Sequence, residues 1–308
     1  MILFISGRTD IPAFYTEWLI NRIHAGYVDV RNPYYGQQVT RYRLNPDVVD
    51  CLVFCTKNPA PLIPRLKELS AFSLYFFVTI TPYGKDIEPL VPPKEQVIGS
   101  VEELAALLGQ KRVAWRYDPI FVNDSYSVAS HIRSFREMAE KLHGSTKRCI
   151  ISFVDLYEKT KKNFPGIREV SAEDRCFLAE ALARIGRETD ISIESCAENG
   201  LANTGVQRGC CVSRSIIEQV TESPLRKQLP IQKQRENCAC LATHDIGAYN
   251  SCPHLCRYCY ANYSAQRVKQ NFAQHDAQSP LLIGQPLPGD ILHEAEQESF
   301  RETQLLLF

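Results

Sequence analysis

The hydrophobic pattern of the chain alternates between short apolar runs and longer segments that have one polar face. Apolar runs of strand length lie at residues 2–6, 51–56, 74–80, 113–119, 149–153 and 191–195. Segments of helical character separate most of these runs. Strands that alternate with helices in this way are typical of βα units, which build a parallel sheet or barrel. The pattern therefore predicts an α/β fold.

Local signals predict several boundaries of these elements. Asp10 and Ser171 have side chains that suit helix N-caps, and Ser100 opens a capping box that predicts a further helix start. One helix is expected from Asp10 to Gly26, and Gly186 is expected to end the helix that Ser171 opens. Residues 27–44 alternate in polarity around a turn, which predicts a β-hairpin inserted between two strands of the sheet. The acidic stretch 290–302 is expected to be helical.

Composition limits the classes of function. The chain has 308 residues with 35 basic and 35 acidic side chains, so its net charge gives no reason to expect non-specific nucleic-acid binding. Gly7 and Arg8 interrupt the apolar start, so no signal peptide is expected, and no apolar stretch is long enough to cross a membrane. Twelve cysteines without a secretory signal indicate a reducing cytoplasm. Cys51 and Cys55 lie in an apolar run and are interpreted as core thiols.

Three cysteines near the C-terminal end suggest a metal centre. Cys252, Cys256 and Cys259 have the spacing C-x3-C-x2-C, and Tyr258 directly precedes the third cysteine. A structural zinc site uses four protein ligands, whereas a [4Fe–4S] cluster held by three thiolates leaves one iron open. His254 within this loop is expected to form hydrogen bonds instead of binding the metal. The spacing favours an iron–sulfur cluster, with a zinc knuckle or a group of core cysteines as the alternative.

With Tyr258 before its last cysteine, this loop resembles the cluster loop of radical SAM enzymes. The run from Asp245 to Cys252 looks closest to the spore photoproduct lyase-like branch, and the whole chain resembles the DUF1848 family. In the radical SAM superfamily the open iron binds S-adenosylmethionine (SAM), and an electron from the cluster cleaves SAM to methionine and a 5′-deoxyadenosyl radical. The resemblance implies a [4Fe–4S] cluster and SAM as cofactors, and an electron donor of the flavodoxin or ferredoxin type.

The resemblance also implies how the fold is arranged. In radical SAM enzymes the cluster loop follows the first strand of a partial (βα) barrel, but here the strand leading to it, residues 241–249, comes last. We therefore expect a circularly permuted, partial TIM-like (βα) barrel of the radical SAM type, whose first and last elements are neighbours. Residues 1–272 are expected to form this single domain, with a hairpin insertion and a cysteine-rich C-terminal region, followed by an extension at 273–308.

Five residues are candidates for binding the cofactor. The resemblance implies that the backbone around Tyr258 contacts the adenine of SAM. Arg116 and Asp118 lie at the exit of a strand and could hold the carboxylate and ribose of SAM, or the substrate. The alternative is that they form a surface ion pair, or that Asp118 caps a turn. Thr56 and Glu194 are weaker candidates of the same kind.

A second set of cysteines lies between the last ordinary strand and the strand of the cluster loop. Cys196, Cys211, Cys238 and Cys240 would be brought together if the permuted barrel closes. Four cysteines suit an auxiliary iron–sulfur cluster or a zinc ion, and their spacing does not separate the two metals. Cys210 is excluded, because neighbouring cysteines rarely bind the same metal. The alternative is a set of reduced, partly exposed thiols.

The tail adds a candidate partner. Residues 304–308, from Gln304 to Phe308, resemble the short motif by which bacterial repair and replication proteins bind the DNA sliding clamp. The alternative is a tail that folds back on its own domain.

The expected function is a cytoplasmic radical SAM-type enzyme with an unknown substrate. The alternatives are a nucleic-acid repair or modification enzyme resembling spore photoproduct lyase, and an iron–sulfur or zinc protein without enzymatic activity.

Overall fold

A parallel β-sheet forms the centre of the computed structural model, which describes residues 1–196, 198–232 and 238–302. Its eight strands follow the order β10-β1-β4-β5-β6-β7-β8-β9, and all neighbouring strands are parallel. The strands are β1 (Ile2–Ile5), β4 (Cys51–Thr56), β5 (Leu74–Thr79), β6 (Val113–Ile120), β7 (Arg148–Phe153), β8 (Ser192–Cys196), β9 (Gln207–Gly209) and β10 (Thr243–Asp245). The predicted α/β fold is confirmed.

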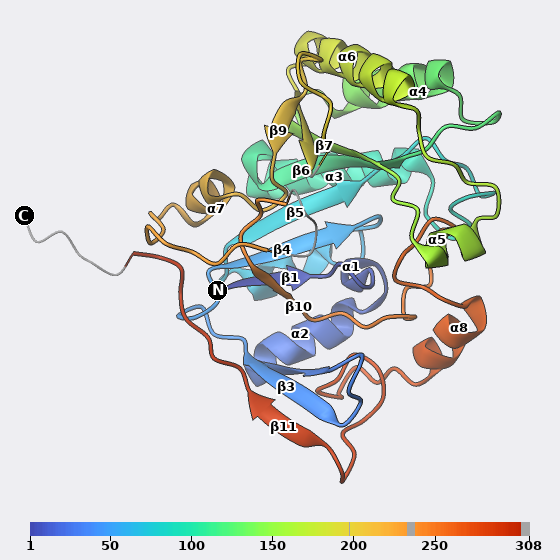
Figure 1. Ribbon diagram of the computed structural model, residues 1–308. Helices are drawn as coiled ribbons and strands as arrows, with labels where there is room; N and C mark the ends of the chain where they lie inside the picture. Colours follow the sequence, from blue (N-terminus) through green and yellow to red (C-terminus); the bar gives the residue numbers. More distant parts are fainter. Residues whose placement is uncertain (197, 233–237, 303–308) are drawn as a thin grey trace, which may run out of the picture.

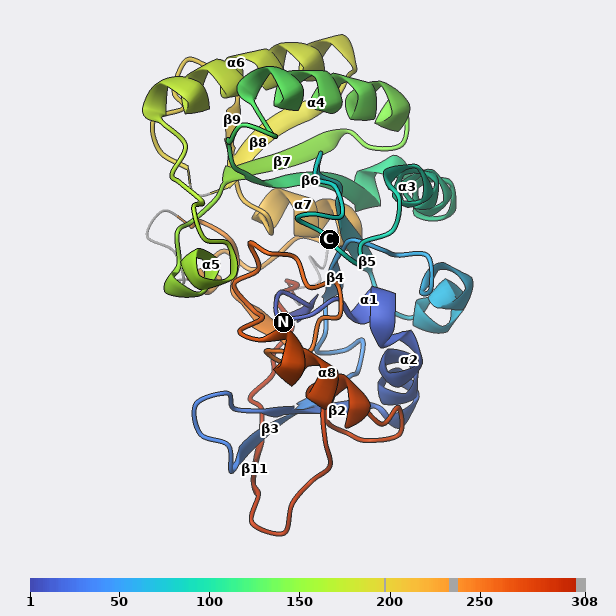
Figure 2. The same cartoon turned by 90° about the vertical axis from the view of Figure 1, so that its right-hand side faces the viewer.

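Helical segments connect the strands of the sheet or follow the last of them. In chain order these are α1 (Ile11–Phe14), α2 (Thr16–Ala25), η1 (Ile63–Leu69), α3 (Lys94–Leu108), η2 (Gln110–Arg112), α4 (Val128–Leu142), α5 (Glu158–Asn163), α6 (Ala172–Glu188), α7 (Arg214–Thr221) and α8 (Ala265–Ala273). The helices α2, η1, α3, α4 and α6 each contact the next one in this order. Figure 1 and Figure 2 show α4 and α6 side by side beyond β7 and β8. None of the described helices combines the length and the apolar character that a membrane span requires.

The strands of the sheet are apolar because both of their faces are buried. Every residue of β5 is buried, and the ring of Phe76 stacks on that of Phe54 in β4 at 4.4 Å between centroids. Trp115 of β6 stacks on Phe135 of α4 at 4.5 Å, and its indole N–H donates to the carbonyl of Ile80 at 2.9 Å. Such continuous apolar runs are characteristic of parallel strands covered on both faces.

The two edges of the sheet come from the C-terminal half of the chain. β10 pairs with β1 in parallel, with Ile2 opposite Thr243 and Phe4 opposite Asp245. The last strand of the sheet along the chain is therefore the spatial neighbour of the first. At the other edge β9 pairs with β8. Within the described ranges no strand pairing joins β9 to β10, so the hydrogen-bonded sheet is open.

A small second sheet confirms the predicted hairpin and corrects the prediction for the C-terminal extension. β2 (Tyr27–Arg31) and β3 (Gln38–Arg43) are antiparallel, and β11 (Ile291–Glu294) pairs with β3 in parallel. Residues 290–302 were expected to be helical and instead contain this strand. The free edge of β3 offers backbone partners, and this tertiary pairing outweighs the helical preference of an acidic stretch.

Three helix boundaries differ from the sequence-based predictions. α3 begins at Lys94, after Pro93, so Ser100 lies in the middle of the helix and its hydroxyl donates to the carbonyl of Gln96 at 3.0 Å. The first helix is interrupted at Tyr15 and forms α1 and α2. α6 continues past Gly186 to Glu188. The predicted caps Asp10 and Ser171 are confirmed, since each accepts a hydrogen bond from the backbone of its helix.

Gly186 is required for close packing and does not end its helix. A Cβ atom at this position would lie 2.5 Å from the carbonyl oxygen of Ile191 and 2.5 Å from a side-chain carbon of Ile193.

We expect Gly186→Ala to lower the free energy of unfolding by about 1–3 kcal/mol, because backbone and core atoms must move apart. At Gly99, within α3, an added Cβ would meet no atom within 4 Å. Gly99→Ala should therefore stabilise the protein by about 0.5–1 kcal/mol. Urea denaturation measures the free energy of unfolding of both variants. Equal changes for Gly186→Ala and Gly99→Ala would contradict the close packing proposed for Gly186.

Candidate functional site

Polar side chains gather at the carboxyl ends of the parallel strands, beneath the loop that follows β10. This loop carries Cys252, Cys256 and Cys259. Its backbone is held from several sides: the hydroxyl of Tyr15 donates to the carbonyl of Ser251 at 2.5 Å. The N–H of Arg257 donates to the carbonyl of Ile87 at 3.0 Å. The loop thus lies across the ends of the strands, where α/β proteins commonly bind ligands.

Asp10 connects this loop to the ends of β1 and β4. One carboxylate oxygen accepts a hydrogen bond from the Thr56 hydroxyl at 2.7 Å, and the other accepts one from the Lys57 backbone N–H at 2.7 Å. Nε2 of His254 lies 2.9 Å from the same carboxylate, and Nδ1 lies 3.2 Å from the carbonyl of Leu90. His254 therefore forms hydrogen bonds, as expected. Thr56, a predicted cofactor contact, is buried and oriented toward Asp10.

The three loop thiols are largely enclosed by protein. Burial raises the pKa of Cys252, Cys256 and Cys259, and each of these thiols is close enough to another for their charges to interact. The backbone N–H groups of His254 and Asp10 point at Cys252 and oppose part of this effect. Burial disfavours the charged form of a thiol. These cysteines would therefore become thiolates most readily with a cation bound beside them.

A buried ion pair lies next to Cys256. The ammonium of Lys57 is 2.8 Å from the carboxylate of Glu88, which also accepts hydrogen bonds from Thr81 and from the hydroxyl of Tyr258. Burial favours a higher pKa for Glu88, but the Lys57 charge and these donors outweigh it and lower the pKa. Burial likewise lowers the pKa of Lys57, and attraction to Glu88 and Cys256 outweighs it and raises the pKa. The phenol of Tyr258, a predicted cofactor contact, is thus committed to Glu88.

Arg116 and Asp118 form an ion pair, but this pair is largely buried and not the surface ion pair of the alternative. The hydroxyl of Ser152 also donates to Asp118. Nη1 of Arg116 lies 3.3 Å from the thiol of Cys55, while Nε is buried without a hydrogen-bond partner in the described part of the chain. Cys55 is therefore only half-buried and faces this guanidinium, whereas Cys51 is fully buried in the core as expected.

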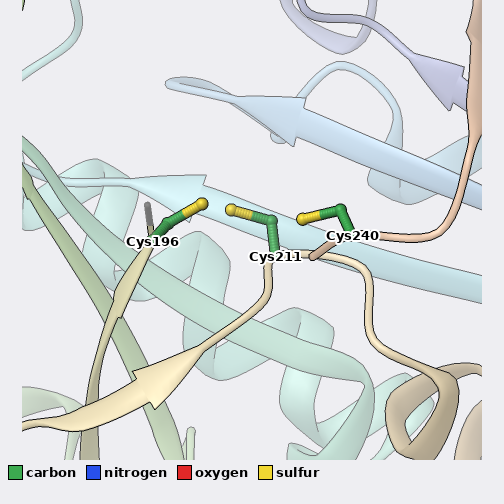
Figure 3. Close-up of side chains that lie close together, drawn as sticks. All are labelled: Cys196, Cys211 and Cys240. Carbon is green, nitrogen blue, oxygen red and sulfur yellow. The ribbon is translucent and has the colours of Figure 1, made fainter. Parts of the chain in front are cut away.

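A second group of thiols comes from the other set of predicted cysteines. Figure 3 shows Cys196, Cys211 and Cys240 with their sulfur atoms directed toward one another. The three Sγ atoms all lie within 4.8 Å of one another, so they could hold a metal ion. Hydrogen bonds from Cys211 and Cys240 lower the pKa of Cys196, and hydrogen bonding to Cys196 raises the pKa of the other two. Cys238, the fourth predicted ligand, is partly buried and does not belong to this compact group.

Arg148 supports this cysteine triad from outside. Its guanidinium donates to the backbone carbonyls of Cys210 at 2.5 Å and Cys211 at 3.3 Å. It also pairs with Glu194 at 2.7 Å. Glu194, a predicted cofactor contact, is therefore paired with Arg148 beside the triad. The roles of Arg148 and of the pair Lys57 and Glu88 were missed by sequence reasoning. The available signal was the position of Lys57 directly after Thr56, where β4 ends, because charged residues at strand ends are candidates for a site.

The match to a known protein family covers both cysteine groups. Residues 2–261 match the family described as Domain of unknown function (DUF1848). The chain belongs to the DUF1848 family. The resemblance inferred from the sequence is confirmed at this level, and the DUF1848 match ends before α8 begins. No curated protein and no solved structure matches the chain.

The Lys57–Glu88 pair leads to a pH-dependent prediction for the metal-free protein. Glu88→Gln should lower the free energy of unfolding at pH 7 by about 3–5 kcal/mol, because it leaves Lys57 buried without its partner. The native pKa of Glu88 lies below its ordinary value of 4.5. Its contribution is therefore fully present above that value and is lost as the pH falls through the lowered native pKa. The gap between wild type and variant should shrink below about pH 4.5.

Urea denaturation at pH 7, 4.5 and 3 measures this gap. Glu103→Gln removes an exposed carboxylate on α3 and serves as the control, with an expected change within about 0.5 kcal/mol. A gap for Glu88→Gln that stays constant over this pH range would contradict the assignment.

Proposed function

We propose that the protein is a radical SAM-type enzyme whose cluster loop holds a [4Fe–4S] cluster through Cys252, Cys256 and Cys259. The observation that supports this most directly is the position of β10. It comes last in the sheet along the chain and yet pairs in parallel with β1, with the cysteine loop at its carboxyl end. A circularly permuted, partial (βα) barrel has this arrangement. The reaction carried out on the substrate stays open.

The thiols of the loop fit such a cluster better than a closed zinc site. His254, the other metal-ligating residue type in the loop, has both ring nitrogens engaged with Asp10 and Leu90. Sulfurs that share one tetrahedral zinc lie about 3.8 Å apart, given Zn–S distances of about 2.3 Å. Among the described residues, Cys196, Cys211 and Cys240 form the only group of potential metal ligands whose ligand atoms all lie within 4.8 Å of one another. Each thiolate of a [4Fe–4S] cluster binds a different iron, so wider spacing is expected.

Several groups near the loop are suited to hold SAM. When bound, the cluster supplies the electron that cleaves SAM to methionine and a 5′-deoxyadenosyl radical. Thr9 and Asn262 have buried side-chain oxygens without hydrogen-bond partners in the described ranges, and Arg116 has an unpartnered Nε. Buried polar atoms normally have partners, so these three are candidates for contacting the polar groups of SAM. Lys57 offsets negative charge beside Cys256.

The proposal carries expectations about partners and location. The cluster needs an electron donor, for which a flavodoxin or ferredoxin is suited. All twelve cysteines are unpaired, which suits a reducing cytoplasm. The tail 304–308 proposed to bind a sliding clamp lies outside the described residues.

Anaerobic reconstitution tests the proposal. Protein supplied with iron and sulfide should bind about four irons at the loop and release 5′-deoxyadenosine from SAM after reduction with dithionite. Cys256→Ala should abolish this release, because a ligand is lost. Cys176→Ala, which changes a cysteine on α6 that belongs to neither cysteine group, should leave it unchanged. If the wild type contains zinc without iron and does not cleave SAM, the proposed enzymatic function is wrong and a non-enzymatic metal protein is favoured.

An exposed aromatic group favours a nucleic acid as the substrate, as the second candidate function. Tyr260 and Tyr263 of the loop are 46% and 36% exposed. The ammonium of Lys159 lies 3.9 Å from the centre of the Tyr263 ring, and the ring of Tyr157 lies 6.3 Å from that of Tyr260. Proteins that bind single-stranded nucleic acids combine aromatic rings for base stacking with positive charges for the phosphates.

Binding of a fluorescent single-stranded DNA tests this candidate at low salt. Tyr263→Ala should weaken binding by about 1–3 kcal/mol, roughly 5- to 150-fold in Kd, because a stacking ring is lost. Phe177→Ala removes an exposed aromatic side chain from α6 and should have no effect. Equal affinities of wild type and Tyr263→Ala would exclude this surface as a binding site.

A further inference from the structure

The cysteine triad lies where the two edges of the open sheet approach each other. Cys196 is the last residue of β8, Cys211 follows β9, and Cys240 precedes β10. β9 and β10 are the opposite edges of the sheet. The backbone N–H of Leu241 donates to the carbonyl of Val212 at 2.9 Å, which joins the segments that carry Cys240 and Cys211. A ligand held by the three sulfurs would therefore connect both edges.

We infer that Cys196, Cys211 and Cys240 bind one zinc ion, which fastens the two edges of the sheet together, and that Cys238 is the fourth ligand. This site is separate from the loop of Cys252, Cys256 and Cys259 and does not depend on the function proposed for that loop.

The spacing of the sulfurs selects a single ion. All three Sγ atoms lie within 4.8 Å of one another. A small inward movement brings them to the roughly 3.8 Å that a tetrahedral zinc with Zn–S distances of about 2.3 Å requires. The thiolates of a cubane cluster bind separate irons and cannot approach so closely. The structure thus separates the two metals that the cysteine spacing in the sequence left open.

The surroundings are suited to negatively charged sulfurs. The Arg148 guanidinium donates to the backbone carbonyls of Cys210 and Cys211 and is oriented by Glu194. Arg116 lies close enough to Cys196 and Cys211 for its charge to interact with theirs. A zinc with four thiolates carries a charge of about −2, and cations nearby reduce the cost of burying it. Residues that orient and stabilise ligands in this way commonly surround metal sites.

Cys238 is the residue that we assign as the fourth ligand. It is two residues before Cys240 and close enough to Cys210 for their charges to interact, while Cys210 interacts in the same way with Cys196. Cys238 is thus separated from a triad residue by Ala239 alone and does not belong to the compact group. Structural zinc sites use four protein ligands. Cys210 is adjacent to Cys211, and the side chains of adjacent residues diverge, so Cys210 is not assigned to the ion.

The experiment uses the full chain with Cys252→Ser, Cys256→Ser and Cys259→Ser, so that the loop cannot contribute a metal. The protein is purified under reducing conditions and analysed for zinc, iron and sulfide. About one zinc per chain is expected. Replacement of the zinc by cobalt(II) should produce the visible absorption of a tetrahedral thiolate complex.

Single variants in this background identify the ligands. Cys211→Ser and Cys240→Ser should lower zinc affinity by more than the roughly 10- to 100-fold typical of a residue outside the ligand set. Cys238→Ser should also weaken binding, whereas Cys210→Ser and Cys176→Ser should not. If the ligand variants do not fold, zinc is removed from the chain that carries only the three loop substitutions and is then added back. The Tm of this chain should fall when zinc is removed and recover when zinc is added.

Several results would overturn the inference. Iron and sulfide in place of zinc would mean an auxiliary iron–sulfur cluster. A disulfide detected under these conditions, or a chain that binds neither zinc nor cobalt, would mean that the triad is not a metal site. Loss of zinc in Cys210→Ser and not in Cys238→Ser would overturn the assignment of the fourth ligand. The absence of SAM cleavage in the wild type would disprove the proposed enzyme and leave this result unchanged.

Discussion

Burial of charge at the carboxyl ends of the parallel sheet is the constraint on which the site depends. Isolated charges cost several kcal/mol to bury, so they occur in pairs. Lys57 pairs with Glu88 and Arg116 pairs with Asp118 near these ends. Arg148, the first residue of β7, pairs in the same way with Glu194 of the neighbouring strand β8. The buried thiols follow the same rule, because their anionic forms need a positive partner. The ion pairs supply part of that positive charge, and a metal would supply the rest.

The two cysteine groups differ in geometry although they use the same residue type. The triad is compact and built from three separate segments, which suits one ion that holds distant parts of the chain together. The loop after β10 carries its three cysteines within eight residues and lies across the polar ends of the strands. We therefore propose a structural role for the triad and a role in chemistry for the cysteines of the loop.

Local signals predicted elements well where the local and tertiary preferences agree. Asp10 and Ser171 cap helices as expected, and the hairpin at 27–44 forms. Predictions were wrong where a partner distant in sequence decides the outcome. Residues 290–302 contain a strand because β3 offers a free edge. Gly186 does not end α6, because it is needed for contact with the segment around Ile191.

The sequence by itself determined the α/β class, the membership of the DUF1848 family and the cysteines that are candidates for metal binding. Apolar periodicity and short motifs are local properties, so they can be recognised without coordinates. Only the tertiary structure decided which thiols meet, that Glu194 supports the triad through Arg148, and that Tyr258 is bound to Glu88. These contacts join residues that lie between 15 positions apart, for Cys196 and Cys211, and 170 positions apart, for Glu88 and Tyr258. A local sequence pattern cannot show which of these residues meet, because the packing of the whole chain determines their contacts.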